Sequence, residues 1–228
     1  MEKVKNKIAS LLHQLGVSAD SLTYAGLLCA LGSGVLAYKG HFFWAGGVLL
    51  LAGSLDLLDG AVARQSRAVS PFGGILDSSL DRYGDAFALC GILFYCSENA
   101  YHGYAALAVS ALLGSFLISY VRARAECVVK KCKVGFWERG ERLVCIALGL
   151  LFNNVPLVLW VLGAGTHLTV LHRLLSARNA SLGQAESSVQ LLPVPPAFLR
   201  LSPRGEAPYL VKCIFLIFLL LFLRLPLQ

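Results

Sequence analysis

Residues 56–81 read DLLDGAVARQSRAVSPFGGILDSSLD, and long apolar runs lie on both sides of this stretch. Four aspartates lie at or just beyond the ends of those runs, where a charge is costly unless it has a partner or a metal. They are Asp56, Asp59, Asp77 and Asp81. The members of each pair are three or four positions apart, so on helices each pair shares one face. Two helix ends can therefore direct four carboxylates toward one point.

Small and basic residues separate the two acid pairs. Gly60, Gly73 and Gly74 let the backbone approach a ligand closely. Arg64 and Arg67 carry guanidinium groups that suit a phosphate. Carboxylate oxygens are the ligands that hard divalent cations prefer. The stretch therefore predicts a divalent metal that holds a phosphorylated substrate.

The spacing of this stretch also resembles a known family motif. It reads Asp56-x-x-Asp59-Gly60-x-x-Ala63-Arg64, then Gly73, and then Asp77-x-x-x-Asp81. These residues fill every position in the motif of the CDP-alcohol phosphotransferases, and eight specified positions at fixed gaps make the resemblance specific. The competing interpretation is a helical hairpin whose acids cap helix ends or pair with Arg64, Arg67 and Arg82. That interpretation does not require both acid pairs at one spacing.

The resemblance implies a reaction and a set of site residues. Members of this family transfer a phosphatidyl-type group from a CDP-linked lipid, such as CDP-diacylglycerol, to an alcohol, and they release CMP. The resemblance implies that a divalent metal, Mg²⁺ or Mn²⁺ and expected as two ions, is held by Asp56, Asp59, Asp77 and Asp81. Asp81 is then the candidate general base on the acceptor hydroxyl. The CDP-binding residues that it implies are Asp56, Gly60, Ala63, Arg64 and Gly73.

The composition predicts an integral membrane protein. The chain has 228 residues, of which 57% are hydrophobic and only 14% charged. Its mean hydropathy is +0.67, more than a soluble core of this size can bury. The net charge of +7 could indicate nucleic acid, but no nucleic-acid-binding motif accompanies it, so we expect it to face anionic lipid headgroups. The seven cysteines are scattered and predict reduced thiols instead of a zinc site or a disulfide framework.

A bilayer core needs about 20 residues of helix, and on that measure the sequence predicts an all-α protein with six spans. We place them near residues 20–38, 42–62, 80–97, 103–125, 141–155 and 157–175. The fifth is the shortest, and we expect its helix to begin earlier, around Glu138. Residues 3–15 predict an amphipathic interfacial helix. Ser18 or Asp20 is the expected N-cap of the first span.

The distribution of basic residues predicts the orientation. Through residue 178, every Lys and Arg except Lys39 falls on the side that holds the N-terminus and the loop 64–82. The positive-inside rule therefore places the acid cluster at the cytoplasmic face of the cell membrane. No cleavable signal peptide is evident, since the first lysines precede only a short apolar patch. We also expect a homodimer.

The chain changes character near its C-terminal end. The family resemblance covers residues 1–178 as one membrane domain, and residues 179–208 are rich in Ser, Pro and Gln, which predicts a linker. The following segment, 209–228, contains an apolar run at 209–225 that is just long enough for a seventh span. A seventh span, an interfacial segment and a segment unrelated to function all stay open.

A second polar cluster predicts where the acceptor alcohol binds. Its basic residues are Arg122, Lys130, Lys133, Arg139 and Arg142, interleaved with glutamates near span ends. Such a cluster suits an anion pocket, although a basic cytoplasmic loop explains the charge equally simply. The segments RARAE and ERGER resemble the branch of the family that uses inositol phosphate. Glycerol 3-phosphate is the alternative acceptor, because it is also a phosphate ester.

Other polar residues predict less. Asp85 extends the Asp77 and Asp81 series by one helical turn, and we expect it to pair with Arg82 or with a polar group of another span. A role in supporting the metal ligands is the alternative. His167 and His172 lack acids at ligand spacing, so packing histidines are the simpler interpretation. A metal-ion transporter is the alternative class of protein, but it would need its acids near the bilayer midplane. An anchoring protein would not need the acids at all.

Overall fold

A computed structural model describes residues 2–65, 70–127 and 135–185, and within these ranges all regular structure is helical. The helices are α1 (Glu2–Gln14), α2 (Ala19–Tyr38), α3 (Phe42–Gln65), α4 (Pro71–Glu98), α5 (His102–Glu126), α6 (Arg139–Leu151) and α7 (Val155–Ala185). The predicted all-α class is confirmed for this part of the chain. Lys130, Lys133 and the apolar run 209–225 lie outside the described residues.

Four of the described helices, α2, α3, α5 and α7, are long and apolar enough to cross a membrane. Helix α4 has the length but carries acids and an arginine in its first half. Helix α6 has 13 residues and rises only about 20 Å, less than the hydrocarbon core. The predicted fifth span, 141–155, is therefore wrong at its end. Asn153, with φ of 52°, turns the chain before Val155 begins α7.

Polar side chains fix the helix starts that surround the acid cluster. The backbone N–H of Ser21 donates to Ser18 Oγ at 3.1 Å, which confirms Ser18 as the N-cap of α2. Ser70 caps α4 in the same way. At α6 the Glu141 side chain accepts from the backbone N–H of Glu138 at 2.9 Å and completes a capping box, so the predicted early start is confirmed.

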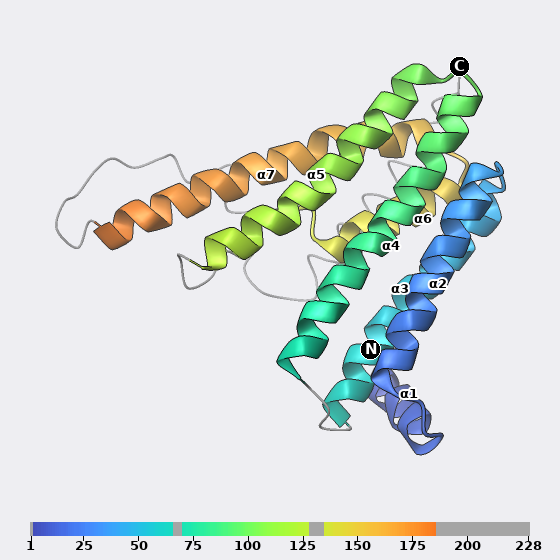
Figure 1. Ribbon diagram of the computed structural model, residues 1–228, viewed down its shortest axis with the longest axis vertical. Coiled ribbons are helices and arrows are strands. Elements are labelled where there is room, and N and C mark those ends of the chain that lie inside the picture. The colour runs from blue at the N-terminus through green and yellow to red at the C-terminus, as the bar shows by residue number, and fades with distance from the viewer. Residues whose placement is uncertain (1, 66–69, 128–134, 186–228) are drawn as a thin grey trace.

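Helices α2, α3 and α4 run alongside one another, while α5 and α7 form a second pair that extends away from them (Figure 1). Close approach between α2 and α4 depends on missing side chains, since a Cβ at Gly91 would collide with the backbone of Gly34. Helix α6 packs mainly against α3 and reaches α7 on its other side. Its first turn therefore lies near the helix ends that carry the aspartates.

Helix α1 lies across the end of the bundle where α3 ends and α4 begins (Figure 1). Ala9 is fully buried in a small cluster with Ala61 and Val62 of α3. Leu11 and Leu15, in contrast, are 57% and 70% exposed. An apolar face that is not covered by protein fits the predicted interfacial helix.

Helix α7 continues past the predicted domain boundary at residue 178 and ends at Ala185. The prolines that forbid a helix begin only at Pro193, so a helix can continue into the predicted linker, and the domain boundary itself stays a prediction.

Candidate active site

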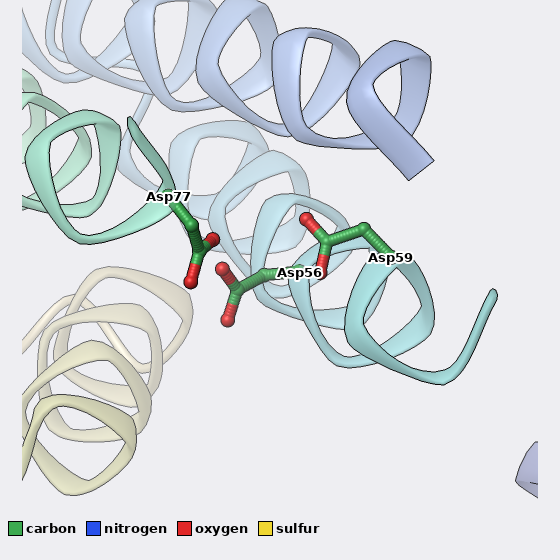
Figure 2. A group of neighbouring side chains, drawn as sticks. All are labelled: Asp56, Asp59 and Asp77. Carbon is green, nitrogen blue, oxygen red and sulfur yellow. The ribbon is translucent and has the colours of Figure 1, made fainter. Parts of the chain in front are cut away.

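Helices α3 and α4 bring three of the four predicted metal ligands together. Asp56, Asp59 and Asp77 each offer a carboxylate oxygen, and these three atoms lie within 4.8 Å of one another. Figure 2 shows the carboxylates of Asp56 and Asp77 facing each other from the two helices, with Asp59 beside them on α3. The short connection between α3 and α4 is what places these helix ends next to each other.

The carboxylates of this cluster are buried or half-buried, so their oxygens need partners. Asp59 is 6% exposed, and Thr23 of α2 donates a hydrogen bond to its Oδ2 at 2.7 Å. The Oδ1 atom of Asp77 is buried and has no hydrogen-bond partner among the described residues. Because buried polar atoms in proteins are nearly always paired, an unpaired carboxylate oxygen pointing at two further carboxylates suits a cation. Thr23 was missed in the sequence, since a partner 36 positions away leaves no local signal.

Asp81 lies next to this cluster but has a different neighbour. Nη1 of Arg139, at the start of α6, lies 2.8 Å from Asp81 Oδ1 and 2.6 Å from Asp56 Oδ2. One guanidinium nitrogen thus joins a carboxylate of α3 to a carboxylate of α4. The structure therefore places Arg139, which we expected at the acceptor, between two predicted metal ligands. The roles of Asp81 as ligand and base stay predictions.

Asp85 pairs with Arg142 of α6, as expected for a polar group of another helix. Nη2 of Arg142 lies 2.7 Å from Asp85 Oδ2, and both side chains are buried. Arg142 Nη1 also donates to the carbonyl of Trp137 at 3.2 Å. Arg142 is therefore held inside the protein and is not a loose surface charge.

A cavity of about 370 Å³ opens beside these ion pairs, between α4, α5, α6 and α7. Its arginines are Arg82, Arg122, Arg139, Arg142 and Arg173, and its carboxylates are Asp81, Asp85, Glu126 and Glu138. All three described arginines of the predicted acceptor site line it. Arg122 pairs with Glu126 at 3.1 Å, so the interleaved glutamates hold an arginine as the sequence suggested.

Arg173 is a cavity residue that sequence reasoning missed as a site residue. It is 2% exposed, and its Nη1 donates to the carbonyl of Ile118 at 2.8 Å. In the sequence it belongs to a basic span end, which the positive-inside rule already explains. Only the packing of α7 against α5 brings it to the cavity.

The predicted CDP-binding residues beyond Asp56 lie at the same end of the bundle. Arg64 is exposed in the last turn of α3, and a Cβ at Gly60 would meet only the Arg64 guanidinium, at 3.6 Å. Gly73 has a local explanation, because a Cβ at this position would lie only 3.0 Å from the Ser70 hydroxyl that caps α4. Ala63 is half-buried one position before Arg64. No bound nucleotide tests these four assignments, which stay predictions.

His167 contacts a neighbouring helix. Its Nε2 lies 3.1 Å from Ser110 Oγ on α5, far along the chain from the aspartates. This contact agrees with a packing histidine.

The comparison with known proteins agrees with the aspartate motif. The sequence profile of the CDP-alcohol phosphatidyltransferases matches residues 17–174, a range that contains the aspartate cluster and all the cavity arginines. The chain therefore belongs to the CDP-alcohol phosphatidyltransferase family: it is a transferase and a multi-pass membrane protein.

Two relatives with named activities are similar to this chain over most of its length. The archaetidylinositol phosphate synthase of Pyrococcus horikoshii is 35% identical over 176 residues, covering 76% of this chain and 90% of the relative. The phosphatidylinositol phosphate synthase of Mycobacteroides abscessus is 31% identical over 189 residues, covering 78% of this chain and 85% of the relative.

Solved structures show the same fold. The Mycobacterium tuberculosis phosphatidylinositol phosphate synthase with CDP-DAG bound superposes with a TM-score of 0.72 at 25% identity, covering 84% of this chain and all of the other. The same enzyme in complex with manganese and citrate gives a TM-score of 0.70 at 25% identity and covers 90% of this chain and 98% of the other.

Proposed function

We propose that this protein transfers the phosphatidyl group of CDP-diacylglycerol to a hydroxyl of inositol phosphate and releases CMP. The observation that carries the proposal is the position of Arg139, whose guanidinium contacts Asp56 and Asp81 and also lines the arginine-rich cavity. Arg139 therefore lies at the boundary between the carboxylate cluster and the anion pocket. Two relatives are named as synthases of archaetidylinositol phosphate and of phosphatidylinositol phosphate, and these products support inositol phosphate as the acceptor.

The residues fit a divalent cation at the carboxylate cluster. Asp56, Asp59 and Asp77 supply hard oxygen ligands from two helices. The Oδ1 atom of Asp77 has no hydrogen-bond partner among the described residues. The manganese complex of the related enzyme supports the same class of ion. Either Mg²⁺ or Mn²⁺, as two ions, suits the proposal. When bound, such a cation would neutralise the diphosphate and the charge that develops on the departing CMP.

The residues of the chain then do the remaining work. Asp81 accepts the proton of the acceptor hydroxyl, whose oxygen forms a bond to the lipid-bearing phosphorus. The bond from that phosphorus to the CMP oxygen breaks, and CMP leaves with both bonding electrons. Arg64, at the exposed end of α3, is placed to contact a phosphate of the nucleotide, next to Gly60, Ala63 and Gly73.

The cavity supplies the acceptor site. Its arginines exceed its carboxylates by five to four among the described residues, and the predicted Lys130 and Lys133 would add positive charge. Arg122 has the most exposed side chain of the ion-paired arginines in the described residues, 35%, and is best suited to exchange its glutamate partner for a phosphate. A phosphorylated alcohol therefore suits this cavity better than an uncharged one.

The placement of both substrates requires a site at the membrane surface, because one is a lipid and the other is water-soluble. The bias of Lys and Arg supports the cytoplasmic face of the cell membrane. Helices α4 and α6 complete the membrane domain beside the four apolar helices, and a homodimer is part of the same proposal.

An acceptor panel tests this function. Full-length protein in lipid nanodiscs would receive CDP-diacylglycerol, Mn²⁺ and either inositol phosphate, glycerol 3-phosphate or unphosphorylated inositol, and CMP release would be measured. We expect saturable release with inositol phosphate only. Saturable release with glycerol 3-phosphate alone would assign the protein to the phosphatidylglycerophosphate synthases, and release with neither would contradict the proposal.

A further inference from the structure

One ion pair at the α4–α6 boundary is more deeply buried than the others. Asp85 is 7% exposed and Arg142 is 3% exposed, and their atoms meet at 2.7 Å. The Arg139 pairs with Asp56 and Asp81 involve side chains that are 18% to 28% exposed. Asp85 lies outside the aspartate motif, so the motif does not explain why a buried acid is kept there.

Stability alone does not explain the pair either. Burying two charges costs several kcal/mol of desolvation for each ion, and their mutual attraction often does no more than offset that cost. Arg142 is also incompletely satisfied, because its buried Nε has no hydrogen-bond partner among the described residues. An ion pair that is costly to bury, is incompletely hydrogen-bonded and lines a cavity is typical of residues that have a function besides folding.

The register of the two helices shows what the pair controls. Asp85 follows Asp81 by four positions on α4, and Arg142 follows Arg139 by three on α6, so each pair of residues shares a helix face. Two ion pairs, Asp81 with Arg139 and Asp85 with Arg142, therefore bridge the same two helices one turn apart. Helix α6 packs mainly against α3, and these two ion pairs also join it to α4.

We propose that Asp85 is a positioning residue for the transfer reaction. By holding Arg142, it fixes the first turn of α6 relative to α4, and it thereby places Arg139 between Asp56 and Asp81 at the wall of the acceptor cavity. Asp85 is not one of the three clustered carboxylates, and it lines the cavity beside Arg142. The inference rests on the proposed function, since it assigns the cavity to the acceptor.

The test separates acceptor binding from folding and from cation binding. Asp85→Asn keeps the shape of the side chain but removes its charge. We expect the KM for inositol phosphate to rise roughly tenfold to a hundredfold, as for a catalytic group displaced by about an ångström. The KM for CDP-diacylglycerol should stay within about twofold of wild type. The Mn²⁺ affinity measured by calorimetry should change less than in Arg139→Gln, because Asp85→Asn displaces the Arg139 guanidinium but does not remove it. Glu98→Gln is the matched control, an acid-to-amide change at the far end of the same helix.

A double-variant cycle tests whether Asp85 acts through Arg142. The variant Asp85→Asn with Arg142→Gln should be no worse than Arg142→Gln alone, because the second change removes nothing further. Additive losses would contradict the proposal, as would an unchanged acceptor KM or equal losses in both KM values together with a lower unfolding temperature. If the amide variant does not fold, Asp85→Glu, which keeps the charge but shifts it by one methylene, must still raise the acceptor KM. Failure of wild-type protein to release CMP would instead overturn the proposed function.

Discussion

The carboxylate cluster and the arginine-lined cavity are built in opposite ways. The cluster takes its three oxygen ligands from two consecutive helices that are joined by a short connection. The cavity is lined by side chains of four helices, α4 to α7, and these lining residues lie between positions 78 and 173 of the chain. The cluster is therefore visible as a motif in one stretch of sequence, whereas the cavity exists only after the helices have packed. Arg139 belongs to both, and variants can show whether the two halves act separately.

Removing one carboxylate from the cluster should have the largest effect. Asp59→Asn or Asp77→Asn replaces a charged ligand with a neutral amide that binds Mg²⁺ poorly, so we expect turnover below about 1% of wild type. The protein should still insert and fold, which size-exclusion chromatography would check. Turnover near wild type in both variants would show that the cluster is structural.

Asp81→Asn should be nearly as damaging but for a different reason. Loss of a general base typically costs a factor of roughly 10² to 10⁴ in kcat. Because Asp81 is not one of the three clustered ligands, Mn²⁺ affinity by calorimetry should fall less than in Asp59→Asn. CMP release equal to wild type would remove the base assignment, and a loss of metal affinity as large as in Asp59→Asn would make Asp81 a ligand only.

Two arginines of the cavity test whether its two ends are distinct. Arg122→Gln should raise the KM for inositol phosphate about tenfold, the value of one charge-assisted hydrogen bond, and leave Mn²⁺ affinity unchanged. Arg139→Gln should alter both quantities, since this guanidinium contacts Asp56 and Asp81. Identical profiles for the two variants would contradict the division between cluster and cavity.

The smallest effect should follow from Thr23→Val. This change keeps the shape of the side chain but removes the hydroxyl that donates to Asp59 Oδ2 at 2.7 Å. Groups that orient a metal ligand typically contribute about tenfold to metal affinity, so we expect up to that loss in Mn²⁺ binding with little change in the acceptor KM. Thr23→Ser, which retains the hydroxyl, should restore the affinity.

The sequence predicted what local spacing determines. The acid pairs, a cap of α2 at Ser18 or Asp20 and a start of α6 around Glu138 all follow from residues within one or two helical turns, and the structure has Ser18 and Glu138 as the caps. It could not predict that Thr23 contacts Asp59 or that Arg173 reaches the cavity, because those contacts depend on packing between distant helices.

The sequence also failed to predict where some helices end. The expectation of about 20 residues for each span placed the end of the fifth span at residue 155. Instead, α6 stops at Leu151, and Asn153, whose backbone is in the left-handed conformation, turns the chain. The change in composition near residue 178 does not mark the end of α7, because no proline follows before Ala185, where this helix ends. Hydropathy and composition thus located the helices but not all of their ends, since α4 also begins at Pro71, before the predicted start at residue 80.

The most direct test of the account is the dependence of CMP release on a divalent cation. Wild-type protein in nanodiscs, with CDP-diacylglycerol and inositol phosphate, would be assayed in excess EDTA and again after Mg²⁺ or Mn²⁺ is restored. We expect no detectable release in EDTA and full recovery with the cation, because Asp56, Asp59 and Asp77 need a positive ion to receive a diphosphate. Undiminished turnover in EDTA would contradict it.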